Sequence, residues 1–317
     1  MWPLIKILPA KTNFRFVGFA RYAGVVSVLA AIASLFLALY PFTPPCGGLN
    51  CGIDFKGGTL LEISTAPADV DLSAVRQRLG AMDLGDVQVQ AFGTASSALV
   101  RFQTPEGESN EQAIEEVKAA LTETLGEVSF PKTEVVGPKV SGELFQNGIM
   151  ALGFAIVLML IYIWFRFELQ YGVGAVVGLF HDVILTFGLI ALIDLEFSLT
   201  SIAAILTIIG YSMNDTVVVF DRLRENLRKY KRMPLRDVID LTINETLSRT
   251  VITGLTTILA LGALAIFGGP TLFGFSVIMI FGVVIGTYSS IYVAAPIILL
   301  WGVRRDDEEA EPLPVRT

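Results

Sequence analysis

The sequence predicts a polytopic α-helical membrane protein with six transmembrane helices and one α+β domain between the first and second of them. Hydrophobic residues make up 53% of the 317 residues and charged residues only 17%. This composition is typical of chains that cross a membrane several times rather than of soluble domains. Six apolar runs are long enough to span a bilayer, and the segment between the first two runs has the mixed composition of a soluble domain.

Each predicted transmembrane helix is an apolar run of about 20 residues, the length that crosses the hydrocarbon core. The runs cover residues 20–41, 147–165, 172–193, 198–220, 250–268 and 274–300. The first run is too long for the apolar part of a signal peptide, and no small-residue cleavage site follows it. We therefore expect it to be retained as a helix.

Basic residues predict the orientation of these helices. The N-terminal segment 1–19 and the connection 221–249 are rich in lysine and arginine, whereas the turns 194–197 and 268–273 contain neither. The positive-inside rule then places both termini in the cytoplasm, with 301–317 as a cytoplasmic tail that we expect to be disordered. The net charge of −7 comes largely from the segment on the outer side, so it does not indicate nucleic-acid binding.

The basic connection 221–249 has two interpretations. Its apolar residues recur at mixed helical spacing, which favours a helix lying on the cytoplasmic membrane interface and held by anionic lipid. A loop that merely obeys the positive-inside rule explains the charges equally well.

The outer segment, residues 42–146, is expected to form one ferredoxin-like domain. Helix patterns at 71–82 and 110–125 alternate with four strand patterns in the order βαββαβ, which is the split-βαβ arrangement. No group of His, Cys or carboxylate residues in it suggests catalysis or a metal site. We therefore interpret this segment as a binding or docking module.

Two cysteines, Cys46 and Cys51, lie in the sequence CGGLNC directly after the first predicted helix. The outer compartment is oxidising, so a disulfide closing a short glycine-rich loop is one interpretation. Two free thiols are the other, because the geometry rather than the spacing decides whether a bridge forms.

Asp215 lies inside the fourth apolar run, about 9 Å from its expected cytoplasmic end at 1.5 Å per helical residue. A carboxylate at the centre of a membrane helix costs about 2.5–3.5 kcal/mol. Protonation, water or a partner cation can each remove that cost. The neighbouring Asn214 adds polarity to the same stretch.

Arg249 is the candidate cation. Together with Glu245, Thr253 and Thr257 it forms a polar stripe of four-residue spacing on the fifth predicted helix, at a depth close to that of Asp215. A proton relay is one interpretation, in which protonation of Asp215 separates the pair and ionisation re-forms it. A static ion pair that fixes helix packing is the other. The proton would be the coupling ion, and the sequence indicates no cofactor and no metal site.

His181 and Asp182 lie inside the third predicted helix, and His181 is the only histidine of the chain. His181 either handles protons directly or only bonds its neighbours. Asp182 either lines the same aqueous path as Asp215 or makes a packing contact.

Glycines at four-residue spacing predict closely packed helices. Gly174 and Gly178 lie in the third apolar run, and Gly282 and Gly286 in the sixth. Small residues at this spacing let helix backbones approach each other within a membrane.

Six stretches of the sequence resemble the SecF family, the smaller membrane subunits of the bacterial SecDF protein-export complex. The first contains an outer-domain motif formed by Phe55, Gly57 and Gly58. In order along the chain, the six stretches are GIDFKGGTLLEI, VGPKVSGEL, HDV, GYSMNDTVVVFDRLREN, NETLSRT and GTYSSIYVA. The resemblance extends from about residue 14 to residue 303 and includes every predicted helix.

The resemblance implies a function that composition alone does not give. It implies half of a transporter of the RND superfamily, paired with SecD in the bacterial cytoplasmic (inner) membrane. The proton-motive force would complete preprotein translocation through SecYEG after the ATP-driven step. Asp215 and Arg249 match the family's essential carboxylate and arginine, and a further aspartate would come from SecD. YajC and YidC are further candidate partners, besides the preprotein and the lipid bilayer.

Two rival functions fit the same helices. A proton-driven exporter of small molecules or lipids would need a substrate pocket, and the outer segment has room for only about one small domain. A scaffold that only assembles the export channel predicts that Asp215 and Arg249 tolerate neutral replacement. A hydrolytic enzyme has no support, because no nucleophile lies in a pattern with a base.

Overall fold

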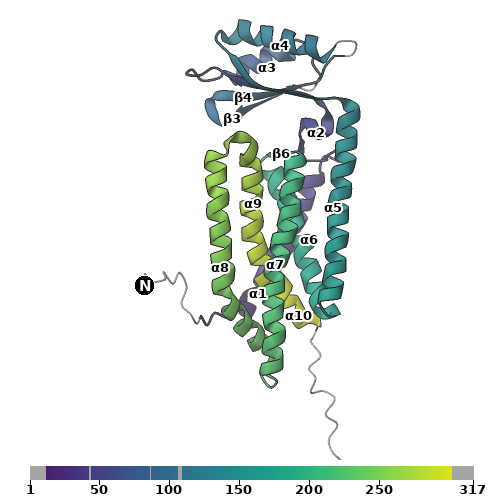
Figure 1. Ribbon diagram of the computed structural model, residues 1–317, viewed down its shortest axis with the longest axis vertical. Coiled ribbons are helices and arrows are strands. Elements are labelled where there is room, and N and C mark those ends of the chain that lie inside the picture. The colour runs from purple at the N-terminus through teal and green to yellow at the C-terminus, as the bar shows by residue number, and fades with distance from the viewer. Residues whose placement is uncertain (1–11, 43, 86, 106–108, 302–317) are drawn as a thin grey trace, which may run out of the picture.

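A computed structural model describes residues 12–42, 44–85, 87–105 and 109–301 of the chain (Figure 1). Long helices lie side by side as a bundle, and an α/β domain covers one end of it. The long helices are α1 (Phe16–Leu39), α5 (Pro138–Arg166), α6 (Leu169–Leu192), α7 (Leu199–Lys229), α8 (Leu235–Phe267) and α9 (Gly269–Ser289). Six stretches, the last running on to Leu300, are long and apolar enough to cross a membrane. The chain is therefore a polytopic helical membrane protein.

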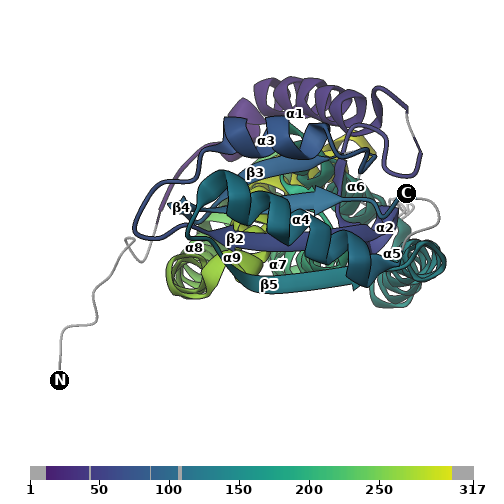
Figure 2. The ribbon, with the colours of Figure 1, turned by 90° about the horizontal axis from the view of Figure 1, so that it is seen from above.

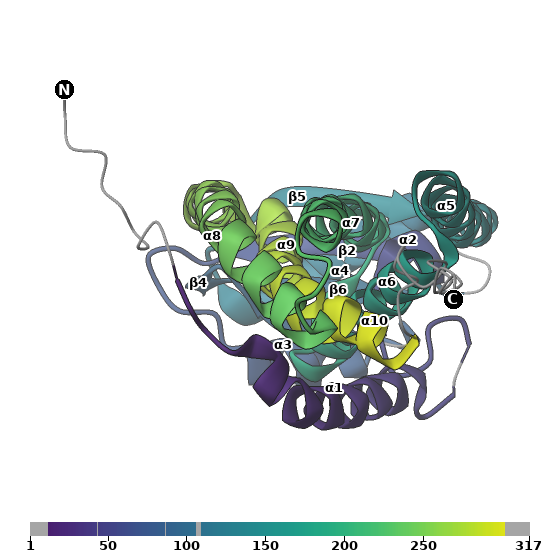
Figure 3. The same ribbon diagram turned by 90° about the horizontal axis from the view of Figure 1, so that it is seen from below.

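The bundle has inner and outer members. In the most apolar windows of α6, α7 and the sixth span, 56% of the residues are buried, against 11–17% in α1, α5 and α8. Figure 3 shows α1, α5 and α8 at the periphery of the bundle. Glycines permit the close approach of the inner helices. A Cβ on Gly174 would lie 2.6 Å from the Ala294 carbonyl oxygen, and one on Gly282 would lie 2.3 Å from Ile208 Cδ1.

The connection 221–249 is helical over most of its length. Residues 221–229 end α7 and 235–249 begin α8, so the interpretation of this segment as a helix agrees with the structure, and the loop interpretation holds only for 230–234. A position on the membrane interface stays a prediction. The two helices stay paired because Asn226 of α7 is fully buried and donates a hydrogen bond from Nδ2 to Thr242 Oγ1 of α8, at 3.0 Å. Polar packing thus prolongs the helices past their apolar parts.

The sixth span is interrupted. After α9 the chain forms five residues of π-helix, η1 (Ser290–Ala294), before α10 (Ala295–Trp301). A π-helical turn adds a residue to the helical path and changes which side chains face inward. The sequence did not predict it.

The α/β domain has the element order βαββαβ, as the sequence predicts. It comprises β2 (Gly58–Ser64), α3 (Leu72–Gly80), β3 (Gln88–Phe92), β4 (Thr94–Phe102), α4 (Asn110–Leu125) and β5 (Ser129–Val136). The strands form one antiparallel sheet in the order β3-β4-β2-β5. Both helices cover the face of the sheet that points away from the bundle (Figure 2). Leu61, Val100 and Val117 are fully buried between sheet and helices.

The outer-domain motif connects the bundle to this sheet. Phe55 lies in a short helix, α2 (Ile53–Lys56), and its ring packs against Phe145 of α5 and Phe197. Gly57 and Gly58 follow with φ of +74° and +108°, which residues with a Cβ rarely adopt. A Cβ on Gly58 would lie 2.7 Å from the Phe102 carbonyl oxygen. The motif therefore anchors an aromatic ring in the bundle and then turns the chain into β2.

Candidate functional site

Asp215 lies on α7 and is half-buried. Its Oδ1 accepts a hydrogen bond of 2.7 Å from the Thr250 hydroxyl of α8. Its Oδ2 is buried and has no hydrogen-bond partner among the described residues. The carboxyl group thus has one strong partner and one oxygen left over.

Arg249 does not form the predicted ion pair with Asp215 in the described part of the chain. It precedes Thr250 on α8 and is exposed on the outside of the bundle. Consecutive helical residues point about 100° apart, so Thr250 faces α7 and Arg249 does not. Thr250 was missed because the stripe through Arg249 carries the charge, whereas the buried stripe lies one residue later. Its signal in the sequence is the recurrence of threonine at 242, 246 and 250.

A polar and small-residue surface surrounds Asp215 on the outside of the bundle. We call it the open face, and it consists of Thr207, Gly210, Asn214, Arg249 and Thr253, all exposed. It includes the predicted accessory residues Asn214 and Thr253. The Thr253 hydroxyl donates to the Arg249 carbonyl oxygen of its own helix at 2.8 Å, whereas Thr250 is the residue whose hydroxyl bonds Asp215.

Glu245, the first residue of the predicted stripe, belongs to a separate set of contacts between α7 and α8. Its Oε2 accepts hydrogen bonds of 2.7 Å from Arg222 Nε and from Asn226 Nδ2. These contacts fix the paired helices beyond Asp215, toward the α7–α8 turn.

His181 and Asp182 lie in a different place, at the centre of the bundle. Asp182 is completely buried, and its Oδ1 lies 2.9 Å from His181 Nδ1. Its Oδ2 accepts hydrogen bonds from the hydroxyls of Ser212 on α7 and, at 2.7 Å, Ser289 on α9. We call these four residues the closed cluster. The structure therefore does not bring Asp182 together with Asp215.

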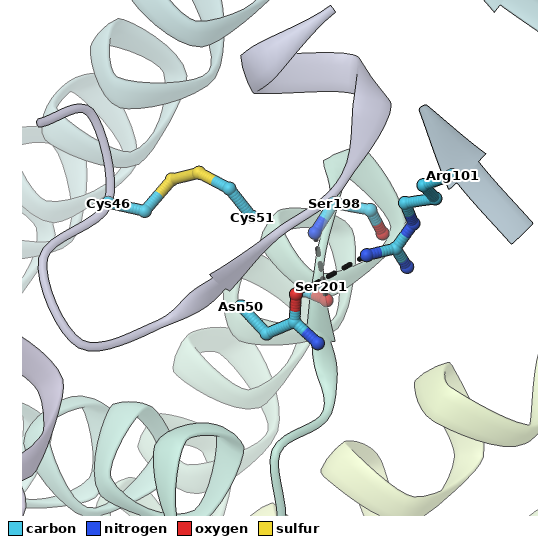
Figure 4. Close-up of a disulfide and its surroundings, with 6 residues drawn as sticks. All are labelled: Cys46, Asn50, Cys51, Arg101, Ser198 and Ser201. Carbon is cyan, nitrogen blue, oxygen red and sulfur yellow. Dashed lines mark hydrogen bonds between the residues drawn. A yellow bond between two sulfur atoms is a disulfide. The ribbon is translucent and has the colours of Figure 1, made fainter. Parts of the chain in front are cut away.

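The α/β domain is attached to the bundle by a joint formed by Asn50, Arg101, Glu196 and two short strands. The strands β1 (Asn50–Cys51) and β6 (Glu196–Phe197) pair in parallel just before α7 begins. Buried Arg101 of β4 forms an ion pair with Glu196. It also donates a hydrogen bond of 3.3 Å to Asn50 Oδ1 (Figure 4). Burial raises the pKa of Glu196, and the Arg101 guanidinium opposes that rise.

The disulfide interpretation of the two cysteines agrees with the structure. Cys46 and Cys51 are joined, with their Cα atoms 6.0 Å apart (Figure 4). The bridge ties the loop after α1 to β1. It therefore lies beside the joint rather than in either intramembrane site.

Among the described residues no group of three or more His, Cys, Asp or Glu side chains has a geometry that could hold a metal ion.

Comparison with known families identifies the chain. The profile described as "Protein export membrane protein SecD/SecF, C-terminal" matches residues 116–304, which include both intramembrane sites. The chain belongs to the SecD/SecF family. A second profile, "SecD/SecF GG Motif", matches residues 48–69 and so includes Phe55, Gly57 and Gly58.

Within this family the chain is similar to SecF subunits over nearly its whole length. "Protein translocase subunit SecF" of Rhodobacter capsulatus is 46% identical over 322 residues, covering 97% of this chain and 95% of the relative. The subunit of the same name from Rickettsia felis is 41% identical over 307 residues, covering 96% of this chain and 97% of the relative. The chain is thus a protein translocase subunit of the SecF type.

Solved SecDF structures share the fold. The crystal structure of SecDF from Thermus thermophilus, described as a translocon-associated membrane protein, matches 93% of this SecF-family chain with a TM-score of 0.82 and 34% identity. A SecDF structure in a super-membrane-facing form matches 94% of it with a TM-score of 0.66 and 35% identity. The chain spans 39% and 40% of the length of those two solved chains.

Proposed function

We propose that this SecF-family chain pairs with a SecD partner in the bacterial cytoplasmic membrane and uses the proton-motive force to complete preprotein translocation through SecYEG. Both termini lie in the cytoplasm and the α/β domain lies outside. The solved SecDF chains support the pairing, because this chain matches only 39–40% of their length and a second part remains for SecD. The orientation is supported by the basic residues near the α7–α8 turn.

The observation that carries the proposal is that only one of the two carboxyl oxygens of Asp215 has a hydrogen-bond partner among the described residues. Among the described residues, Asp215 has one hydrogen bond, a buried oxygen without a partner and a cation held apart from it, and this arrangement suits a protonated carboxyl group. On loss of the proton, the long Arg249 side chain can turn from the open face toward the carboxylate. Asp215 therefore has two arrangements that differ by one proton, and each changes the contact between α7 and α8.

The open face is the surface we assign to SecD. Polar side chains on the outside of a membrane bundle are costly against lipid and are normally covered by protein or water. Gly210 lies at its middle, with no atom within 4 Å of the position where a Cβ would lie. A second helix can therefore approach α7 closely there, next to Asp215.

Helix α7 connects the proton site to the α/β domain. Asp215 lies 16 residues after Leu199, which corresponds to about 24 Å of helix. At that end the Leu199 backbone amide donates a hydrogen bond of 2.9 Å to Asp54 Oδ2. The joint between Arg101 and Glu196 lies directly before it. A tilt of α7 would therefore be passed to the domain.

We assign the α/β domain to the ferredoxin-like class and propose that it contacts the emerging preprotein. Its antiparallel order β3-β4-β2-β5, with both helices on one face, supports the class. YajC and YidC remain proposed partners of the complex, and the proton remains the proposed coupling ion.

The test is gradient-driven completion of export in inverted vesicles that hold this chain, its SecD partner and the translocon. A preprotein is stalled partway, ATP is removed, and a proton gradient is imposed. Asp215→Asn and Arg249→Ala are expected to assemble normally and to leave the preprotein stalled. Asp221→Asn is the matched control, because this α7 carboxylate is bonded to Arg166, the last residue of α5, and it is expected to complete export. If Asp215→Asn and Arg249→Ala both complete export, the chain acts as a scaffold.

A further inference from the structure

The closed cluster contains a titratable pair that the proposed function does not use. Asp182 is completely buried, and His181 is only 7% exposed. In the described part of the chain Asp182 makes no ion pair with lysine or arginine, and the titratable group bonded to it is His181. The groups that face the pair from other helices are Ser212 of α7, with Tyr288 and Ser289 of α9.

The π-helical turn shapes this cluster. Ser289 and Ser290 are consecutive and both fully buried, yet they bond different helices. Ser289 donates to Asp182 of α6, while the Ser290 hydroxyl lies 2.9 Å from Thr216 Oγ1 of α7. π-Helical turns occur frequently at functional sites. Here the turn begins directly after Ser289, so it adjoins the residue that bonds Asp182.

The hydrogen bonds suit an ionised Asp182 beside a neutral imidazole. The two serine hydroxyls donate to Oδ2, and a proton on His181 Nδ1 would donate to Oδ1 at 2.9 Å. A carboxylate with three donors is well stabilised even away from water. In this state the pair carries one negative charge.

His181 Nε2 supplies the independent observation. It is buried and has no hydrogen-bond partner among the described residues, although buried polar atoms are nearly always bonded. An open ring nitrogen next to a carboxylate is a place where a proton can add. Addition there converts the pair to an imidazolium and a carboxylate with no net charge, which a membrane interior favours.

We propose that His181 and Asp182 form a second proton-binding site, separate from Asp215, that takes up one proton at His181 Nε2 and shares it within the pair. After uptake, the proton can move between His181 and Asp182 without any further proton entering or leaving the pair. When the Nδ1 proton passes to Asp182 Oδ1, a neutral acid faces a neutral imidazole whose proton is on Nε2, and the net charge stays zero. The inference goes beyond the proposed function, because it does not require Asp215 to carry protons.

Proton uptake at this site changes the contacts of α7. Ser212 is bonded to the Asp182 carboxylate and lies three residues before Asp215 on the same helix. A carboxylate accepts hydroxyl hydrogen bonds more strongly than a neutral acid does. The attachment of α7 and α9 to α6 is therefore weakest in the arrangement in which Asp182 is a neutral acid.

The single histidine makes a direct test possible. The full-length chain, carrying ¹⁵N-labelled histidine and a histidine-free affinity tag, is placed in lipid vesicles, so that every ring signal in solid-state NMR comes from His181. The pH is varied across a range that brackets the ordinary histidine value of about 6.5. We expect two interconverting sets of ring-nitrogen signals. A ring that stays in one protonation state throughout would overturn the proposal.

Three variants sharpen this test. In Asp182→Asn the ring should bind its proton at least about tenfold more weakly, because the facing carboxylate is lost. Thr186→Val is the matched control: among the described residues this buried hydroxyl bonds only the Asp182 backbone oxygen, so the titration should be unchanged. In Asp215→Asn the titration should persist. An unchanged titration in Asp182→Asn, or its loss in Asp215→Asn, contradicts a separate site.

A further measurement with sodium distinguishes proton binding from the binding of a metal cation. At fixed pH, exchanging potassium for sodium should leave the His181 signals in place. If sodium moves them as lower pH does, the cluster binds a metal cation instead, and the proposal fails. Because the unmodified chain already decides the main question, the test does not depend on Asp182→Asn folding.

Discussion

Asp215 and Asp182 are both carboxyl groups inside the same bundle, yet they are held in opposite ways. Asp182 has His181 and two serine hydroxyls as partners and is completely enclosed by this chain. Asp215 has one hydroxyl partner and borders the exposed open face. Both are linked to α7: Asp215 is a residue of that helix, and Asp182 accepts a hydrogen bond from Ser212 on it. This chain thus supplies the partners of Asp182 itself, whereas the surface beside Asp215 is available to a partner protein.

This difference separates stability from function. Removing a carboxylate whose partners are all buried leaves those partners unbonded, which is costly. Removing one that has a single partner leaves little behind. Folding should therefore depend on Asp182, and activity with the partner should depend on Asp215.

The largest expected difference in stability is between Asp182→Leu and Asp215→Leu. Asp182→Leu leaves two serine hydroxyls and an imidazole without their acceptor and should lower the free energy of unfolding by about 3 kcal/mol. Asp215→Leu loses one hydrogen bond and removes a polar group from the membrane, so its change should stay within about 1 kcal/mol. Thermal unfolding of both purified chains in one detergent measures this. Equal losses would end the distinction between the two sites.

Two glycines on neighbouring helices test the open face. Gly282→Leu places a side chain against Ile208, 2.3 Å from the added Cβ, and should destabilise the chain by about 1–3 kcal/mol. Gly210→Leu meets no atom of this chain within 4 Å, so its unfolding should match that of the unmodified protein. Its association with SecD should weaken at least about tenfold, or ~1.4 kcal/mol. Normal co-purification of Gly210→Leu would show that SecD docks elsewhere.

The smallest effect is expected at Glu196, a carboxylate outside the bundle. Burial raises its pKa in the folded chain above the ordinary value of 4.5, so the folded state binds the proton more tightly than the unfolded state. Stability should therefore fall as the pH rises from about 4.5 to the raised pKa and then level off. Glu196→Gln should lower overall stability, because Arg101 loses its counter-ion, and should flatten this slope. Unfolding curves across that pH range compare the two. An identical slope would mean that Glu196 does not titrate in the folded joint.

The sequence predicted the elements more completely than their contacts. Apolar runs of about 20 residues indicated six membrane helices, and alternating patterns indicated the βαββαβ order. Both depend on local periodicity, which the sequence displays directly. The pairing of α7 and α8 through the connection 221–249 was not predicted, because it depends on Asn226 contacting Thr242 of the other helix.

For the candidate sites too, the sequence identified the functional residues more completely than the contacts they make. Asp215 and Asp182 were identifiable because charged residues in apolar runs are rare. Their partners were not identifiable, because a helix that is apolar on all sides does not reveal which face points inward. Thr250 rather than Arg249 bonds Asp215, and Asp182 meets Ser212 and Ser289 of two other helices.

The most direct test of the central claim measures protons rather than export. Inverted vesicles holding the chain, SecD, the translocon and a stalled preprotein carry a pH-sensitive dye inside, and decay of an imposed proton gradient is followed. The gradient should decay faster in the unmodified protein and in Asp221→Asn than in Asp215→Asn, and the difference should vanish without the preprotein. Equally fast, preprotein-dependent decay in Asp215→Asn would contradict the claim that Asp215 carries the coupling proton.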